Sequence, residues 1–267
     1  MGQPAAMAFK AKTMINFFRN IRKQLADDNE PLKYMRYAIG EIFLVVIGIL
    51  IALSINNWNE QRKNNNLERE FLYRLRADLV IDSTYYSKRI QDAENFIRIN
   101  RNFIGELYKE QQNYADVKNL FEKLSLGSEQ LTSQNSTYQE LINDGKLNLI
   151  RNKKLKSALI NYYRDTEVAD KHIEEFNVFS VNVLLNAMEN IPNLSRVLKY
   201  DLNIGQYDFK FKGQYEFVND PHSAKFQISE DVATVYTNKQ MVFLTYFEDL
   251  KEKTKHLIHS INAITDN

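Results

Sequence analysis

The sequence predicts a mostly α-helical protein, with one transmembrane helix followed by an extracytoplasmic helical bundle whose first and last helices are long. Three observations lead to this fold class. Only 8 Gly and 4 Pro interrupt the 267 residues, which is few for a loop-rich or all-β chain. An unbroken apolar run lies near the start of the chain. Apolar residues then recur at helical spacing over most of the remainder.

The apolar run is Ala-Ile-Gly-Glu-Ile-Phe-Leu-Val-Val-Ile-Gly-Ile-Leu-Ile-Ala-Leu-Ser-Ile, residues 38–55. As a helix it would be about 27 Å long, close to the hydrocarbon thickness of a bilayer. Tyr34 and Tyr37 before it and Trp58 after it are the expected interface anchors, because amphipathic rings favour the membrane–water boundary. A buried helix of a soluble protein rarely stays apolar on every face for this length. A cleaved signal peptide is the remaining alternative, with Ala52-Leu-Ser54 as its cleavage site.

One face of this helix is a candidate association surface. At about 100° per residue, Glu41, Val45, Gly48, Ala52 and Ile55 lie on the same side. Gly48 and Ala52 have the small-xxx-small spacing that allows two membrane helices to approach closely. The alternative is that Gly and Ala are simply common in membrane spans.

The chain is expected to have three parts. Residues 1–37 form a cytoplasmic tail with a short basic amphipathic helix, residues 38–56 the transmembrane helix, and residues 57–267 a periplasmic helical domain. Five Lys and Arg lie within 20 residues on each side of the span, so flanking charge does not orient it. The short tail favours a cytoplasmic N-terminus.

Apolar spacing predicts the helices of the third part. The first runs over about 67–111, where Asp82 and Asn100 interrupt the apolar seam and favour packing within one domain over a coiled coil. A last helix over about 229–263 is expected to pack antiparallel to it. Between them we expect helices over 117–126, 152–165 and 168–190, a loop over 128–137, a capping box at 137–140 with a short helix that ends at Gly145, and a small β-hairpin near 207–228.

No catalytic or cofactor motif is present. The chain has no Cys, which excludes disulfides and cysteine ligands, and it contains no nucleophile elbow, phosphate loop or dinucleotide-binding motif. His256 and His259 share a helix face but lack further ligands, so a solvated face is the better interpretation. With 35 basic and 34 acidic residues, nothing indicates nucleic-acid binding. We therefore expect no catalytic residues, no cofactor and no metal.

Two stretches carry a resemblance to a known family. Residues 14–22, Met-Ile-Asn-Phe-Phe-Arg-Asn-Ile-Arg, and residues 37–60, which end in Asn-Asn-Trp-Asn-Glu, resemble single-pass membrane proteins of Bacteroidota known only as a domain of unknown function. Residues 138–147 and Tyr162-Tyr163 are similar to the same family. The resemblance implies a cytoplasmic N-terminus and a periplasmic helical domain, and it implies no activity. Members usually begin at the equivalent of Met14, so residues 1–13 are a departure.

The function expected from these observations is that of a membrane-anchored, non-enzymatic envelope protein in the bacterial inner membrane. Its periplasmic helical domain would mediate protein interaction or self-assembly. The expected partners are membrane lipid and either a second copy of the chain or another envelope protein. Two alternatives remain open: a periplasmic ligand-sensing module that relays through the membrane helix, and an unrecognised hydrolase.

Overall fold

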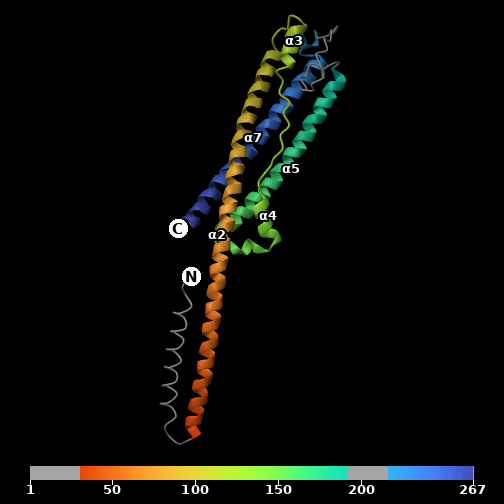
Figure 1. Ribbon diagram of the computed structural model, residues 1–267. Coiled ribbons are helices and arrows are strands. Elements are labelled where there is room, and N and C mark those ends of the chain that lie inside the picture. The colour runs from red at the N-terminus through yellow and green to blue at the C-terminus, as the bar shows by residue number, and fades with distance from the viewer. Residues whose placement is uncertain (1–30, 192–215, 267) are drawn as a thin grey trace, which may run out of the picture. The chain divides into compact units, whose positions relative to one another are not determined.

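The computed structural model describes residues 31–191 and 216–266, and the chain divides into two compact units, residues 1–66 and 67–267. All regular elements of the described residues are helices, which confirms the mostly α-helical prediction with long first and last helices. In chain order they are α2 (Pro31–Leu107), α3 (Tyr114–Phe121), α4 (Ser136–Asn143), η1 (Lys146–Leu149), α5 (Lys153–Asn190), η2 (Glu216–Asn219) and α7 (Ala224–Thr265), shown in Figure 1.

Local hydrogen bonds set where several helices begin. The side chain of Asn152 caps α5 by accepting the backbone N–H of Lys154 at 3.0 Å, which satisfies one of the donors a helix start leaves free. The last helix begins at Ala224 rather than near Ser229, because Ser223 is its cap and accepts the N–H of Phe226 at 3.2 Å.

Three sequence predictions about the shorter elements are wrong. Residues 152–165 and 168–190 belong to one helix, α5, since neither Gly nor Pro lies between them. The predicted capping box does not form, because the cap of α4 is Asn135, two residues before Thr137, and Asn135 makes no side-chain cap bond. Of the predicted hairpin, residues 216–219 are η2 and residues from Ala224 onward are α7; residues 207–215 lie outside the described residues.

Within residues 67–267, α7 runs antiparallel to α2. Arg69 near the start of the unit donates to the backbone carbonyl of Thr265 at 2.9 Å, and Tyr108 after the end of α2 donates to Glu230 Oε1 at 2.7 Å. Residue numbers therefore rise along one helix as they fall along the other. The predicted antiparallel packing of the first and last long helices is confirmed.

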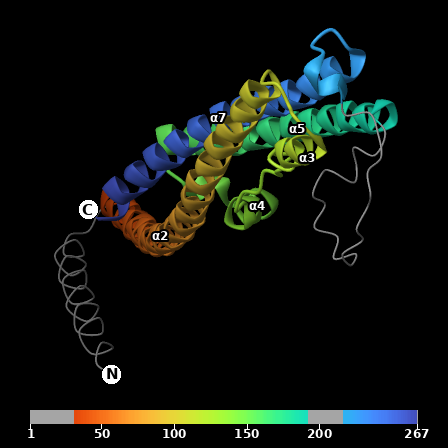
Figure 2. The same cartoon turned by 90° about the horizontal axis from the view of Figure 1, so that it is seen from above.

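The α5 helix runs parallel to α2 in this bundle. Near its start Arg151 donates from Nε to Glu68 Oε2 at 2.7 Å, and farther along Tyr162 donates to Asp82 Oδ2 at 2.7 Å. α5 also lies alongside α7, as the view from above shows (Figure 2). Since α2 and α5 are consecutive long helices with the same direction, the chain between them must return along the bundle.

The returning chain is extended where it passes beside α2. We call residues 124–135 the strap; Figure 1 shows it running from α3 to α4. Ser125 pairs with Asn100 and Gln134 pairs with Asp82. The 18 helical steps from Asp82 to Asn100 span about 27 Å, and nine extended steps from Ser125 to Gln134 span about 30 Å. The strap therefore covers about the same length as this part of α2 with half as many residues.

The apolar core of the bundle consists of two clusters. The first joins the earlier part of α2 to the later part of α7 and contains Leu75, Tyr86 and Phe247. The second joins the end of α2 to the start of α7 and contains Phe103 and Phe226. Between them lies a group of buried polar side chains, which we call the polar layer: Asn100, Glu129, Ser180, Lys239 and Gln240.

Two glycines offer a matched test of the backbone. Gly145 has φ of 64°, a conformation that costs an L-residue roughly 1–2 kcal/mol. Gly105 is helical, exposed and has open space around an added Cβ. Gly145→Ala should therefore lower the free energy of unfolding by about 1 kcal/mol, and Gly105→Ala should raise it by about 0.5–1 kcal/mol.

Urea denaturation of the full chain in detergent, followed by circular dichroism, measures both changes. Equal effects of the two substitutions would contradict the assigned backbone conformations.

Candidate functional site

The apolar segment of α2 is exposed in the described structure. None of its most apolar 18-residue stretch is buried. Ile42 is 65% exposed and Phe43 is 63% exposed, whereas soluble proteins rarely leave large contiguous apolar patches in water. This is the one helix in the described residues that is long and apolar enough to cross a membrane.

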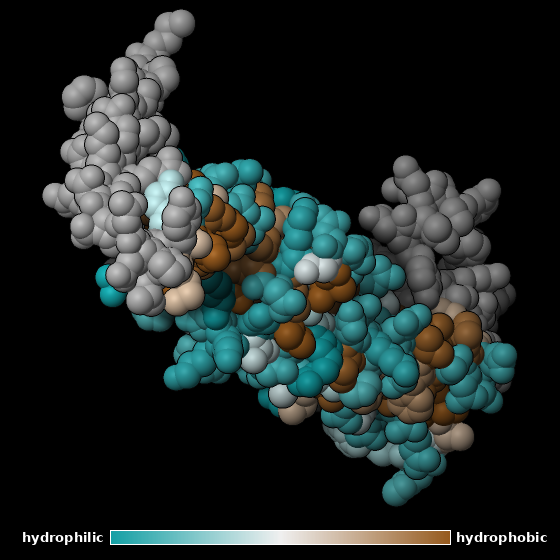
Figure 3. Space-filling view, turned by 90° about the horizontal axis from the view of Figure 1, so that it is seen from below, coloured by the Kyte–Doolittle hydropathy of each residue, from teal (hydrophilic) through white to brown (hydrophobic). Residues whose placement is uncertain are grey.

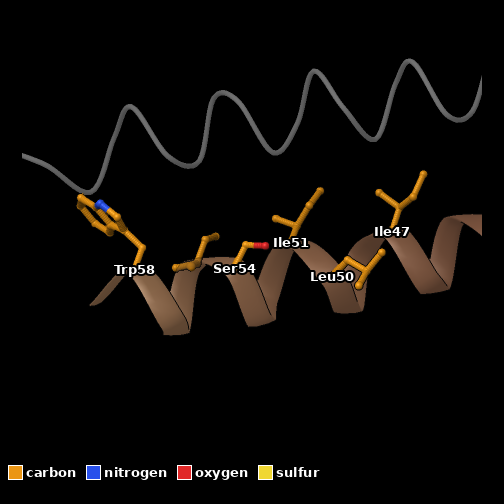
Figure 4. Close-up of a pocket in the computed structure, with 6 residues that line it drawn as sticks. Ile47, Leu50, Ile51, Ser54 and Trp58 are labelled. Atoms are coloured by element: carbon orange, nitrogen blue, oxygen red, sulfur yellow. The ribbon is translucent and has the colours of Figure 1, made fainter. Parts of the chain in front are cut away.

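The residues of the predicted association face all lie in this segment. Glu41, Val45, Gly48 and Ala52 are exposed on α2, and a Cβ added at Gly48 would meet no atom within 4 Å. A second side of the same helix is hollowed: Ile47, Leu50, Ile51, Ser54, Ile55 and Trp58 line a shallow apolar pocket (Figure 4). The pocket side shares Ile55 with the predicted face but none of Glu41, Val45, Gly48 and Ala52.

The predicted interface anchors lie on both sides of the segment within α2. Trp58 is 63% exposed and Tyr37 is half-buried. Tyr34 falls in the first turn of α2, and its side chain lies outside the described residues.

Inside the bundle, Asp82 joins the strap to two tyrosines. Its Oδ1 accepts the backbone N–H of Gln134 at 2.7 Å, and its Oδ2 accepts the Tyr162 hydroxyl at 2.7 Å. The Tyr162 and Tyr86 hydroxyl oxygens lie 3.1 Å apart. Burial raises the pKa of Asp82 to about 6; the bonds from Tyr162 and Gln134 oppose this shift and the nearby Asp78 carboxylate adds to it.

Asn100 holds the other end of the strap. Its Nδ2 donates to the carbonyl of Ser125 at 3.0 Å, and its Oδ1 accepts the N–H of Ser125 at 2.9 Å. The side-chain amide of Asn100 therefore pairs with the strap as a neighbouring strand would. Asp82 and Asn100 are the two polar residues that interrupt the apolar seam of the first helix. Both form hydrogen bonds with the strap.

The middle of the strap is held by α5 and α7. Lys239, 1% exposed, donates to the carbonyl of Gly127 and to Asn177 Oδ1. Its ammonium lies 4.4 Å from the centroid of the Tyr236 ring, a cation–π distance. Asn177 Nδ2 donates to the carbonyl of Glu129 at 2.6 Å. Burial lowers the pKa of Lys239 to about 8, and the Glu129 carboxylate opposes that shift.

These contacts hold the strap against the three long helices. Each polar group in them meets another protein group rather than an open cavity, and Asp82 and Lys239 are each 1% exposed. Over the described ranges, no group of three or more His, Asp and Glu is placed to hold a metal. His256 lies 3.5 Å from Glu252 on an exposed helix face, and His172 pairs with the Tyr246 hydroxyl at 2.6 Å.

The later part of α5 carries large apolar side chains on its exposed surface. Val178, Phe179, Val181 and Leu185 are between 41% and 57% exposed, and three of them, Val178, Val181 and Leu185, follow at helical spacing on one side. We call these four residues the α5 patch. Figure 3 shows one face of the molecule, on which apolar side chains gather in patches among polar ones.

Fold and site together define a chain with one exposed apolar helix segment and a helical bundle braced by an extended strap. The chain belongs to a family of unknown function, DUF6090, whose family model matches residues 41–201. The match takes in most of the apolar segment, the strap and α5, and it ends before α7. No curated protein and no solved structure matches the chain.

Of the polar layer, sequence reasoning singled out Asn100 and missed the other members. Lys239 and Gln240 lie between the apolar residues Tyr236 and Phe243 in the seam of α7, the same signal that Asp82 and Asn100 give in α2. The strap itself appeared in the sequence as an expected loop over 128–137, without any indication that it is held in the core.

The raised pKa of Asp82 gives a pH-dependent prediction. The folded protein binds this proton more tightly than the unfolded chain, in which the same carboxyl has its ordinary pKa of 3.8. Stability from this group is therefore present below about pH 4 and is lost as pH rises to about 6, by roughly 1–3 kcal/mol. In Asp82→Asn the loss should vanish, because the amide can accept the Gln134 N–H and donate to Tyr162 without becoming charged.

Denaturant unfolding of wild type and Asp82→Asn between pH 4 and pH 8 checks this prediction. The control is Asp82→Leu, which leaves Gln134 N–H and the Tyr162 hydroxyl without an acceptor and should lower stability by about 1–3 kcal/mol at every pH. A difference between wild type and Asp82→Asn that does not change with pH would show that Asp82 does not titrate in this range.

Proposed function

We propose that this protein is a non-enzymatic membrane protein whose helical bundle binds another protein or a second copy of itself. The exposed apolar segment is the observation that carries the membrane anchor. Burying a side chain such as Ile42, Ile49 or Leu53 is worth about 1.5–3 kcal/mol over leaving it in water. A bilayer accommodates a whole run of such residues, and the flanking Tyr37 and Trp58 suit its two interfaces.

The proposed topology is that of a single-pass protein of a bacterial inner membrane, with a cytoplasmic N-terminus and a periplasmic bundle.

The interaction role of the bundle is supported by the α5 patch. Its four large apolar side chains are exposed within two turns of one helix, and clustered exposed apolar residues are typical of protein-binding surfaces. The interior of the bundle is occupied by apolar clusters, polar layer and strap, so the surface is the part available to a partner. The exposed face of Glu41, Val45, Gly48 and Ala52 is a second candidate contact between copies.

The anchor is tested by membrane extraction. The wild-type chain should stay with membranes after alkaline carbonate treatment. Val45→Asp with Ile49→Asp should release it, because each central aspartate costs roughly 2.5–3.5 kcal/mol in a bilayer. Val80→Asp with Ile160→Asp adds the same charge at exposed bundle positions and should leave the chain membrane-bound.

Release of the wild type by carbonate would contradict the anchor.

The orientation is tested by labelling a thiol. Ser157→Cys introduces a thiol at an exposed site of a chain without Cys. A membrane-impermeant thiol reagent should label it in spheroplasts; protection until the membrane is opened would reverse the proposed topology.

The interaction is tested by site-specific photo-crosslinking in native membranes. A crosslinker at Val178, Val181 or Leu185 should give one discrete adduct, whereas the same group at the exposed Lys88 of α2 should give none. Identical patterns at all four positions, or no adduct at any, would exclude the α5 patch as an interface.

The helix face is tested separately. If two copies of the chain also associate through the face of Glu41, Val45, Gly48 and Ala52, crosslinking should join one copy to another. Gly48→Leu should then reduce the yield of this crosslinked dimer at least several-fold, because the larger side chain holds the two helices apart. Leu50→Ile lies on another side of α2 and keeps the volume of the side chain unchanged. It is the control and should leave the yield of the crosslinked dimer unchanged.

A further inference from the structure

A basic stretch lies at one end of the bundle. Acidic side chains at the same end are paired: Glu68 with Arg151, Glu140 with Arg74 and Asp144 with Lys146. Residues 146–156, Lys-Leu-Asn-Leu-Ile-Arg-Asn-Lys-Lys-Leu-Lys, contain five cations and no acidic residue. Arg151 is held there by Glu68, which accepts its backbone N–H at 2.8 Å and its Nε at 2.7 Å. The stretch therefore lies at the end of the bundle where residue 67 begins the unit. The lower end of the bundle in Figure 1 holds α4 and the start of α5.

Two lysines at this end have no counter-charge in the described structure. Lys153 and Lys154 are the first two residues of α5, both are exposed, and neither forms an ion pair with a described residue. Arg151 keeps 67% of its side chain exposed although it pairs with Glu68. The first turn of α5 has no acidic residue. Cations are unfavourable at a helix N-terminus, where the macrodipole is positive, so helix stability does not account for them.

Charge is segregated along the whole of α5. Residues 153–164 contain four cations and no acidic residue, whereas residues 165–190 contain six acidic residues and one lysine. This order opposes the macrodipole at both ends. A negatively charged surface outside the protein, facing the start of α5, would favour this arrangement of basic residues first and acidic residues last. Such a surface attracts the basic end of the helix and repels the acidic end.

Chain length restricts where such a surface can be. Leu67 follows Ile55, the end of the apolar segment, by twelve positions, a span of at most about 40 Å. The chain therefore tethers the start of the bundle within about 40 Å of the end of the apolar segment.

We propose that the end of the bundle formed by Arg151, Lys153 and Lys154, with Lys156 beside them, binds the head groups of anionic phospholipids in the membrane that holds the apolar segment. This inference rests on the proposed membrane anchor. The contact is electrostatic: lysine and arginine near an anionic bilayer are attracted to it, and salt screens the attraction. It turns the basic end of α5 toward the membrane and the acidic end away.

The test uses the full chain reconstituted in vesicles of phosphatidylcholine, alone or in equimolar mixture with phosphatidylglycerol. Ser157→Cys carries an environment-sensitive fluorophore near the basic end, and a lipid with a head-group quencher reports contact. A probe on the bundle is needed because the basic stretch near Arg19 would bind anionic lipid as well. Phosphatidylglycerol should increase quenching, and high salt should reverse the increase.

Charge removal makes the test specific. Lys153→Gln with Lys154→Gln should lower the ratio of membrane-bound to free bundle about 30-fold, the loss expected for two basic residues at an anionic surface. Lys88→Gln with Lys171→Gln, which removes two exposed charges elsewhere, should leave the ratio unchanged. Equal quenching in both lipids, or equal effects of the two double variants, would overturn the proposal.

Flotation of the same samples separates this inference from the anchor. A chain that floats with phosphatidylcholine vesicles but shows no response to phosphatidylglycerol has the anchor without the lipid contact. A chain that floats only with phosphatidylglycerol vesicles, in a salt-dependent way that Lys153 and Lys154 determine, has the lipid contact without the anchor.

Discussion

The bundle depends on the hydrogen bonds that hold the strap. An extended chain packed against helices has N–H and C=O groups on both sides, and each one that is shielded from water without a partner costs free energy comparable to a lost hydrogen bond. No neighbouring strand is available to the strap among the described residues, so helices supply side chains instead. Asn100 and Asp82 come from α2, Asn177 from α5 and Lys239 from α7. The parallel direction of α2 and α5 requires such a connection.

The same side chains fix the register of the three helices. Asp82, Lys239 and Glu129 are buried charged residues, and a buried charge that loses its partner is strongly destabilising. Sliding one helix by a turn would separate Lys239 from Asn177 or Asp82 from Tyr162. Apolar side chains tolerate such a shift better, because their contacts have no direction. Asp82 and the polar layer therefore select one alignment among those that the apolar seams allow.

Much of the fold follows from local signals in the sequence. Helical spacing identified the long first and last helices, and the interruptions at Asp82 and Asn100 marked positions that contact the strap. The course of the strap could not be predicted, because its partners lie far away in the chain: Asn100 is 25 residues from Ser125 and Lys239 is 112 residues from Gly127. The predicted hairpin failed over its described part, since Ser223 starts a helix there and short alternation does not outweigh that cap.

The division of the apolar core has a thermodynamic consequence. Local opening of a protein follows cooperative units, whose free energies differ within one fold. Here the cluster around Phe103 and the cluster around Leu75 use the same three long helices but are separated by polar contacts. The half near α3 can open by breaking the bonds of Asn100 and Lys239 while the other half keeps its packing. Amide exchange should accordingly show two levels of protection along single, uninterrupted helices.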